Sequence, residues 1–104
     1  MKIKLLHTSD CHVWQEAERQ LATALGELNL PKEYEVILIG NEKQAKENHF
    51  LGSPQITIDG ADIDPMTKNA HSFNAISCRP YFYKGKFYDY PPKEMIKEAI
   101  KVEN

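Results

Sequence analysis

The spacing of apolar and polar residues predicts a strand, a helix and a second strand at the start of the chain. Residues 3–7 (IKLLH) are mostly apolar, which is typical of a short strand. Apolar residues then recur in steps of three and four from Trp14 to Leu28, which predicts a helix with one buried face. Residues 34–39 (YEVILI) are almost continuously apolar, as in a strand covered on both faces. The two strands should be parallel and joined by a right-handed crossover.

Capping residues suggest where the first two helices begin. Thr8, Ser9 and Asp10 are all good N-cap types, and any of them could start the first helix. Asn41 followed by Gln44 predicts a second, shorter helix that ends near residue 49.

The second half of the chain predicts two more strands and a terminal helix. Residues 55–59 alternate polar and apolar positions, as in a strand with one buried face, and Asp59-Gly60 marks a turn after it. The segment 61–77 is polar, irregular and too long for a simple hairpin loop. Residues 80–84 (PYFYK) predict a strand at a sheet edge, and Pro91-Pro92 begins the last helix.

The resulting order β-α-β-α-β-β-α indicates one α/β domain over residues 1–104, and the composition agrees with it. Hydrophobic residues make up 41% of the chain and charged residues 27%, as in ordinary globular domains. The net charge of −2 disfavours a nucleic-acid partner, since phosphate contacts need clustered Lys and Arg. No apolar run is long enough to cross a membrane and no signal-peptide core is visible, so we expect a cytoplasmic location.

Two short motifs carry a family resemblance. Cys11 follows the first predicted strand, and Ser53-Pro54 precedes the third within the segment FLGSPQITIDGADIDP. With the element order and the later segment CRPYFYKGKFYDYPPKEMIKEAI, they resemble the thioredoxin/glutaredoxin family, in particular small prokaryotic thioredoxin-like proteins. The resemblance implies a four-stranded mixed sheet in the order 2-1-3-4 with helices on both faces. It also implies a cis Ser53-Pro54 bond beside Cys11, with backbone that pairs with extended substrate.

The sequence departs from the family at the redox motif, where Cys11-His12-Val13-Trp14 stands in place of C-x-x-C. Dithiol exchange needs a second thiol to resolve the mixed disulfide, and Trp14 cannot do so. Single-cysteine members of the family instead form a mixed disulfide with a small thiol such as glutathione. This implies Cys11 as the nucleophile and His12 as the residue that tunes or orients its thiolate. The basic and Gly-rich features of a glutathione site are not evident here.

The roles of the two cysteines stay open at this point. A helix N-terminus beside Cys11 would favour its thiolate, but Cys11 could equally be an inert residue packed under Trp14. Cys78 is the candidate second thiol. Because the predicted strand 80–84 should begin at the end of the sheet opposite Cys11, a buried structural Cys78 is favoured over an 11–78 disulfide.

The substrate contacts implied by the resemblance are Ser53 and Pro54, with Trp14 as a third candidate. Trp14 lies on the apolar stripe of the first helix, which favours a core anchor over a substrate platform.

Other constellations give weaker predictions. His7, Cys11 and His12, with or without Asp10, lack the spacing of a recognised metal site, so we expect no metal. Six aromatic residues fall between positions 81 and 90. They are typical of an edge strand that packs under the last helix, and exposed ones could form a homodimer or partner surface.

Two hypotheses of different classes follow. In the first, the chain is a monothiol, glutaredoxin-like thiol–disulfide oxidoreductase or thiol-binding protein that uses Cys11. In the second, it is a redox-inactive interaction module built on the same fold. Its partner would be a protein or a small-molecule thiol or disulfide, and the sequence does not settle whether it is an enzyme.

Overall fold

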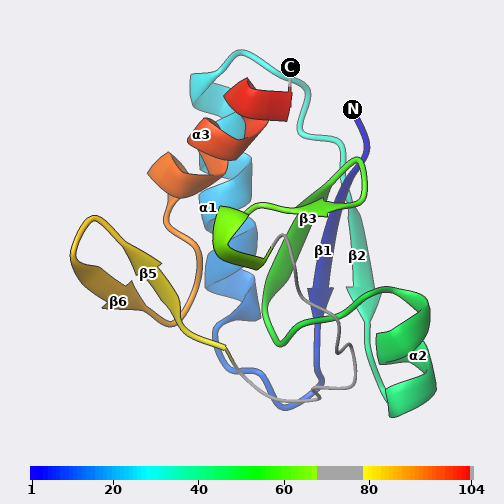
Figure 1. Ribbon diagram of the computed structural model, residues 1–104. Helices are drawn as coiled ribbons and strands as arrows, with labels where there is room; N and C mark the ends of the chain where they lie inside the picture. Colours follow the sequence, from blue (N-terminus) through cyan, green and yellow to red (C-terminus); the bar gives the residue numbers. More distant parts are fainter. Residues whose placement is uncertain (68–78, 104) are drawn as a thin grey trace.

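The computed structural model describes residues 1–67 and 79–103, and its main sheet holds four strands in the order β2-β1-β3-β4 (Figure 1). β1 is parallel to β2 and antiparallel to β3, and β3 is antiparallel to β4. The strands are β1 (Ile3–His7), β2 (Glu35–Leu38), β3 (Gln55–Ile58) and β4 (Ala61–Asp62). The predicted mixed sheet and its strand order are therefore confirmed.

Helices cover both faces of this sheet, also as predicted. α1 (Trp14–Glu27) and α3 (Lys93–Glu103) lie side by side on one face, and the short α2 (Glu42–Glu47) lies on the other (Figure 1). Side chains of a strand alternate between faces, so β1 serves two cores. Ile3 and Leu5 join the larger cluster under α1 and α3, whereas Leu6 joins a smaller one with α2.

The apolar segment 34–39 is not covered on both faces, so that prediction is wrong. It contains β2, which is the outer strand of the sheet, and Val36 and Leu38 are 42% and 53% exposed. Ile37 packs on the smaller core, but the cluster under α1 and α3 takes its strand residues from β1 and β3. A continuous apolar run thus lies at a sheet edge.

The fourth strand of the sheet is also not where the sequence predicted it. Asp59 and Gly60 both have positive φ, at 50° and 86°, as a two-residue hairpin turn requires, so the chain pairs back at once as β4. Residues 80–84 instead contain β5 (Tyr81–Tyr83), which forms a separate two-stranded sheet with β6 (Lys86–Tyr88). A short 3-10 helix, Pro65–Thr67, follows β4, and the rest of the segment 61–77 lies outside the described residues.

The predicted cap of the first helix is corrected as well. α1 begins at Trp14, and its N-cap, Val13, makes no side-chain capping bond. Residues 8–12 form a loop instead. The cap of α2 is confirmed, because the Asn41 side chain accepts a hydrogen bond from the Gln44 amide at 2.9 Å. Among the described residues, no helix combines the length and apolar character that a bilayer span needs.

Candidate functional site

The Ser53-Pro54 bond is cis, as the resemblance implied, and its loop lies against the loop that follows β1. The Thr8 amide donates a hydrogen bond to the Ser53 hydroxyl oxygen at 3.1 Å. From the other side, the Arg79 amide donates to the Ser53 carbonyl at 3.0 Å. Ser53 is fully buried, so its side chain and its carbonyl are both engaged by this chain's own backbone.

Cys11 lies in the same place. Its amide donates to the Thr8 carbonyl at 3.3 Å, and Thr8 is the residue that is bonded to Ser53. The Cys11 thiol is free and the residue is 5% exposed. Because α1 begins at Trp14, Cys11 precedes the N-cap by two residues and is not part of the helix N-terminus. The predicted support of its thiolate by the first turn is therefore weakened, since that effect falls off beyond the first turn.

Tyr81 is bonded to the proline loop. Its hydroxyl donates a hydrogen bond to the Pro54 carbonyl, and its side chain is fully buried. Burial raises the pKa of Tyr81 well above its ordinary value of 10.0, although the positive charge of Arg79 opposes this rise. We call Cys11, Ser53, Pro54, Arg79 and Tyr81 the Cys11 site.

Arg79 ties the Cys11 site to β4. Its guanidinium donates to both carboxylate oxygens of Asp62, at 2.7 and 3.2 Å, and lies 3.6 Å from a carboxylate oxygen of Asp64. The three side chains are only 10%, 7% and 16% exposed. Burial lowers the pKa of Arg79, but Tyr81 and the two carboxylates together raise it by more than burial lowers it. The net change is upward, so Arg79 stays charged. Its guanidinium also lies over the Tyr81 ring, 4.3 Å from the centroid.

Gly52 makes room for this arrangement. Its φ of +129° is unfavourable for residues with a side chain, and an added Cβ would stand 2.9 Å from the Cβ of Arg79. The close approach of residue 79 to the proline loop therefore depends on a glycine at this position.

One polar group of the Cys11 loop has no partner. The Thr8 hydroxyl is buried, and no described residue forms a hydrogen bond with it. Buried polar groups in folded proteins almost always have a partner, so the Thr8 hydroxyl is an exception within the loop that carries Cys11.

The ring of Trp14 packs against His7. Its indole stacks on the His7 imidazole, with centroids 4.1 Å apart and an interplanar angle of 11°. The Nδ1–H of His7 donates to the Thr8 carbonyl at 3.0 Å. Trp14 is half-buried and packs on the core under α1, in agreement with an anchoring role. Its role as a substrate contact stays a prediction.

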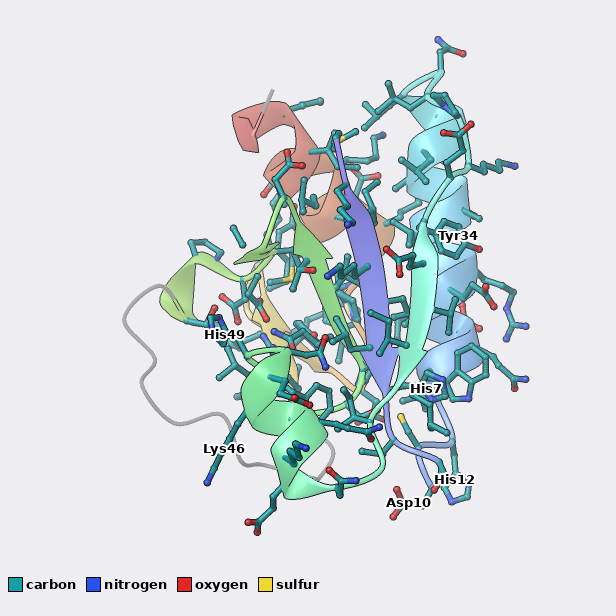
Figure 2. All side chains as sticks on the ribbon, turned by 90° about the vertical axis from the view of Figure 1, so that its right-hand side faces the viewer. His7, Asp10, His12, Tyr34, Lys46 and His49 are labelled. Atoms are coloured by element: carbon teal, nitrogen blue, oxygen red, sulfur yellow. The ribbon has the colours of Figure 1, made fainter. Side chains whose placement is uncertain are left out.

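The remaining predicted residues are placed as follows. His7, Asp10 and His12 lie at one end of the molecule, and Asp10 and His12 are exposed (Figure 2). Over residues 1–67 and 79–103, no three side chains of His, Cys, Asp or Glu gather as metal ligands would. Cys78 lies outside the described residues. The reasoning that placed the chain before β5 at the far end of the sheet is wrong, because Arg79 contacts Ser53.

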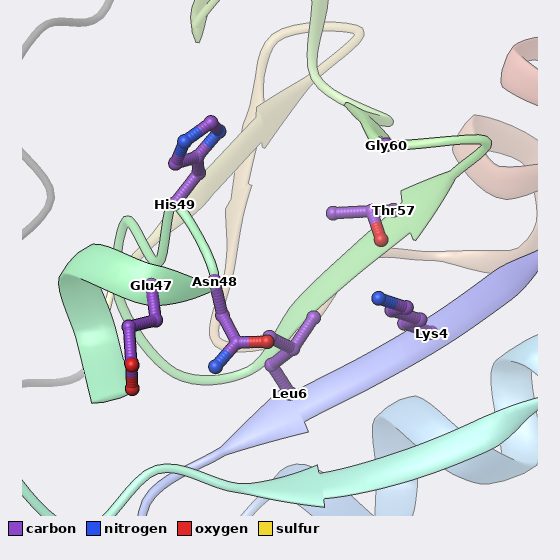
Figure 3. A pocket seen from close by; sticks show the side chains of 7 residues that line it. All are labelled: Lys4, Leu6, Glu47, Asn48, His49, Thr57 and Gly60. Atoms are coloured by element: carbon purple, nitrogen blue, oxygen red, sulfur yellow. The ribbon is translucent and has the colours of Figure 1, made fainter. Parts of the chain in front are cut away.

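A separate small cavity opens on the other face of the sheet. It has a volume of about 170 Å³ and is lined by Lys4, Leu6, Glu47, Asn48, His49, Thr57 and Gly60 (Figure 3). It carries charges of both signs, and none of its lining residues belongs to the Cys11 site.

Three contributors to the Cys11 site were missed by the sequence analysis, namely Arg79, Tyr81 and Asp62. Tyr81 was noted only as one aromatic among six, and Asp62 only as part of an irregular segment. The available signal was Gly52, directly before Ser53-Pro54, because a glycine there indicates close approach by another part of the backbone.

Comparison with known proteins gives one match. Neither the curated proteins nor the solved structures contain a significant match to this chain. Residues 6–100, nearly the whole chain, match a family described as Domain of unknown function (DUF2703). The chain therefore belongs to the DUF2703 family.

Proposed function

We propose that this protein is a thioredoxin-like thiol–disulfide exchange protein in which Cys11 is the nucleophile. The observation that carries the proposal is the convergence of a free thiol, a cis-proline loop and a buried tyrosine hydroxyl at one end of the sheet. Thr8 connects the loops through its amide and its carbonyl. Loops that are far apart in sequence thus meet beside Cys11.

The chemistry needs the Cys11 thiol, a substrate disulfide and a second thiol. The Cys11 thiolate attacks one sulfur of a disulfide R–S–S–R′, which forms Cys11–S–S–R and releases R′–S⁻. The proton lost by Cys11 ends on the released thiol. A second thiol R″–SH then attacks the Cys11 sulfur of the mixed disulfide, which releases R–SH and forms Cys11–S–S–R″. The substrate has then gained two electrons and two protons, and Cys11 and the second thiol are oxidised together into one disulfide.

Two groups could supply the second thiol. One is a small thiol such as glutathione, as in the monothiol scheme. The other is Cys78, which precedes Arg79 in the sequence, and Arg79 contacts the proline loop through its amide. Mass spectrometry of the oxidised protein distinguishes them, because an 11–78 disulfide lowers the mass by two hydrogens, whereas a mixed disulfide adds the small thiol.

The burial of Cys11 restricts the substrate. Because the residue Cys11 is only 5% exposed, we expect its thiol to react with a small disulfide or with one on a thin extended chain, and much less with one on a rigid surface. The Ser53 carbonyl, which the resemblance assigned to substrate, is already bonded to the Arg79 amide. Ser53 and Pro54 therefore act first as supports of the site, and His12, which is exposed beside Cys11, remains the proposed residue that orients the thiolate.

The rate of exchange with a small aromatic disulfide tests the proposal. Cys11→Ser should abolish the fast reaction of the folded protein, and Cys78→Ser should leave its first step unchanged. Thr8→Val sharpens the test, because it replaces an unsatisfied hydroxyl with a methyl group of similar shape and should cost little stability. If the Thr8 hydroxyl donates to the reacting sulfur, this variant exchanges more slowly while it unfolds at an unchanged temperature. Equal rates for wild type and Cys11→Ser would refute the proposal.

A second candidate, the redox-inactive interaction module, is favoured by a different feature. Phe82 and Phe87 are 58% and 75% exposed, and their rings form a cross-strand pair with centroids 4.9 Å apart on the β5–β6 hairpin. Exposed aromatic pairs are typical of protein-binding surfaces. If Cys11→Ser keeps all partner binding while Phe82→Ser removes it, the module is the better description.

A further inference from the structure

The outer edge of β2 is open. β2 is the outer strand of the sheet, and among the described residues it pairs only with β1 (Figure 2). Val36 and Leu38 expose 42% and 53% of their surface, although they belong to the most apolar segment of the chain. Exposed strand edges of this kind pair readily with another strand.

The hydrogen bonds to β1 show which residues of β2 face outward. The Ile39 amide donates to the His7 carbonyl at 2.8 Å, and His7 is in register with Leu38. In a strand, the N–H and C=O groups of successive residues point to opposite sides. Ile37 and Ile39 therefore bond inward to β1. Val36 and Leu38 direct their N–H and C=O groups to the open edge.

We propose that β2 pairs with β2 of a second copy of this chain, antiparallel and across a twofold axis at Ile37. In this register Val36 faces Leu38 of the second copy, and Leu38 faces its Val36. Both pairs join outward-facing residues, so each exchanges two N–H···O bonds. The four side chains lie on the same sheet face and form one apolar cluster, and the two sheets become continuous.

The edge of β2 is complementary to itself, because the outward-facing Val36 and Leu38 of one copy face Leu38 and Val36 of a second copy. Only registers that place outward residues opposite one another can form hydrogen bonds. A shift by two residues in one direction would set Val36 against Gly40, which offers no side chain. A shift in the other direction would set Leu38 against Tyr34, whose side chain packs on the larger core and bonds to Glu18 on α1. The proposed register also sets Glu35 opposite Ile39, so no like charges oppose one another. The Glu35 carboxylate has its own cation, with Lys2 Nζ at 3.9 Å.

Disulfide trapping tests the register directly. In a Cys11→Ser/Cys78→Ser background, Ile37→Cys places two thiols on the axis, where Cα atoms of an antiparallel pair are about 4.5 Å apart and can form a disulfide. Oxidation should therefore trap most of the protein as a covalent dimer. Val36→Cys is the matched control, because the two copies of residue 36 would be diagonal neighbours about 7–8 Å apart and should link poorly. Equal trapping of both variants overturns the proposed register.

Sedimentation over a hundredfold dilution series tests the dimer itself. The wild type should be dimeric at the highest concentration and Leu38→Lys monomeric, while circular dichroism shows that both are folded. Phe82→Lys is the second control, since it changes the other exposed apolar site, and it should remain dimeric. A monomeric wild type, or a dimer that Phe82→Lys dissociates and Leu38→Lys does not, overturns the proposal. The result is independent of thiol chemistry, because the Cys11→Ser variant should dimerise equally well.

Discussion

The two outer strands of the sheet, β4 and β2, differ in the side chains that they carry and in how far these are buried. β4 has only two residues, and its Asp62 is held by a nearly buried ion pair to Arg79. β2 is longer and presents Val36 and Leu38 to solvent. The edge at β4 carries the nearly buried Asp62–Arg79 ion pair, and we call it the closed edge. The edge at β2 carries exposed apolar side chains, and we call it the open edge.

The difference shows that buried ion pairs and exposed apolar residues have separate roles in this small domain. Around β4, the ion pairs hold Arg79, and Arg79 holds the proline loop beside Cys11. Burial makes this network sensitive to the loss of any one partner. Around β2, single substitutions leave no buried group unsatisfied. The closed edge should therefore control the stability of the fold and the geometry of the Cys11 site. The open edge should control association between copies of the chain.

Removal of the Arg79 side chain should have the largest effect. Arg79→Ala leaves the carboxylate of Asp62 without its cation, and the loss of one partner from a buried pair costs about 3–5 kcal/mol. Denaturant unfolding measures it, with Lys84→Ala at an exposed position as the control. A difference below about 1 kcal/mol, the usual range of surface pairs, would mean that the closed edge is no stronger than a surface ion pair.

Tyr81→Phe should have the next largest effect. The change keeps the ring but removes the donor to the Pro54 carbonyl, and an unsatisfied buried acceptor costs about 1–3 kcal/mol. Tyr83→Phe is the control, because the Tyr83 hydroxyl bonds to Glu98 at an exposed position. If both variants lose the same stability in thermal unfolding, the Tyr81 hydroxyl does not hold the site.

The pH dependence of Tyr81 gives a related and separate prediction. Burial raises its pKa in the folded protein, so the folded form stays neutral where the unfolded chain ionises. The contribution of Tyr81 is thus fully present below its ordinary value of 10.0 and is lost as the pH rises above it. The stability difference between wild type and Tyr81→Phe should shrink in alkaline denaturation curves. A constant difference up to pH 11 would contradict this.

On the open edge, Leu38→Thr should change the stability of the monomer by less than about 0.5 kcal/mol, as is usual for exposed positions. Leu6→Ala, on the neighbouring strand, is the contrasting variant, since Leu6 is buried and such a change costs about 2–5 kcal/mol. Unfolding at a concentration low enough to exclude association provides both values. A large loss in Leu38→Thr would mean that β2 is not an open edge.

An exposed ion network should give the smallest effect. Glu27 on α1 accepts hydrogen bonds from Lys93 and Lys97 on α3, and these lower its pKa below the ordinary 4.5. A lowered carboxylate pKa stabilises the fold above the unfolded value and loses this effect as the pH falls through the folded one. The small difference between wild type and Glu27→Gln should therefore disappear in acid. Its persistence at pH 2 would exclude this cause.

The local pattern was sufficient to predict much of the fold. The amphipathic stripe of α1, the Asn41 cap and the cis Ser53-Pro54 bond were all anticipated, because each depends on neighbouring residues or on a family motif. The exposure of residues 34–39 was not anticipated. Exposure depends on which strand lies outermost, and strand order is set by contacts between residues far apart in sequence. The strand β4 was missed because two residues carry too short a pattern to show alternation.

The candidate site also contains residues that could be predicted from the sequence and residues that could not. Cys11 and the proline loop could be predicted because each carries its own motif. The contacts of Arg79 could not, because they join residues that lie 17 and 26 positions apart, where spacing says nothing about distance. The roles of Cys11, His12, Trp14 and Cys78 in exchange, a cytoplasmic location and the lack of a nucleic-acid partner remain predictions.

The most direct measurement is the reaction of the native Cys78→Ser protein with oxidised glutathione, followed by intact mass and peptide mapping. If Cys11 is the exchange nucleophile, the folded protein gains one glutathione at Cys11, and dithiothreitol removes it again. If the native protein stays unmodified and Cys11 reacts only after unfolding, the thiol is a structural residue and the exchange function is wrong.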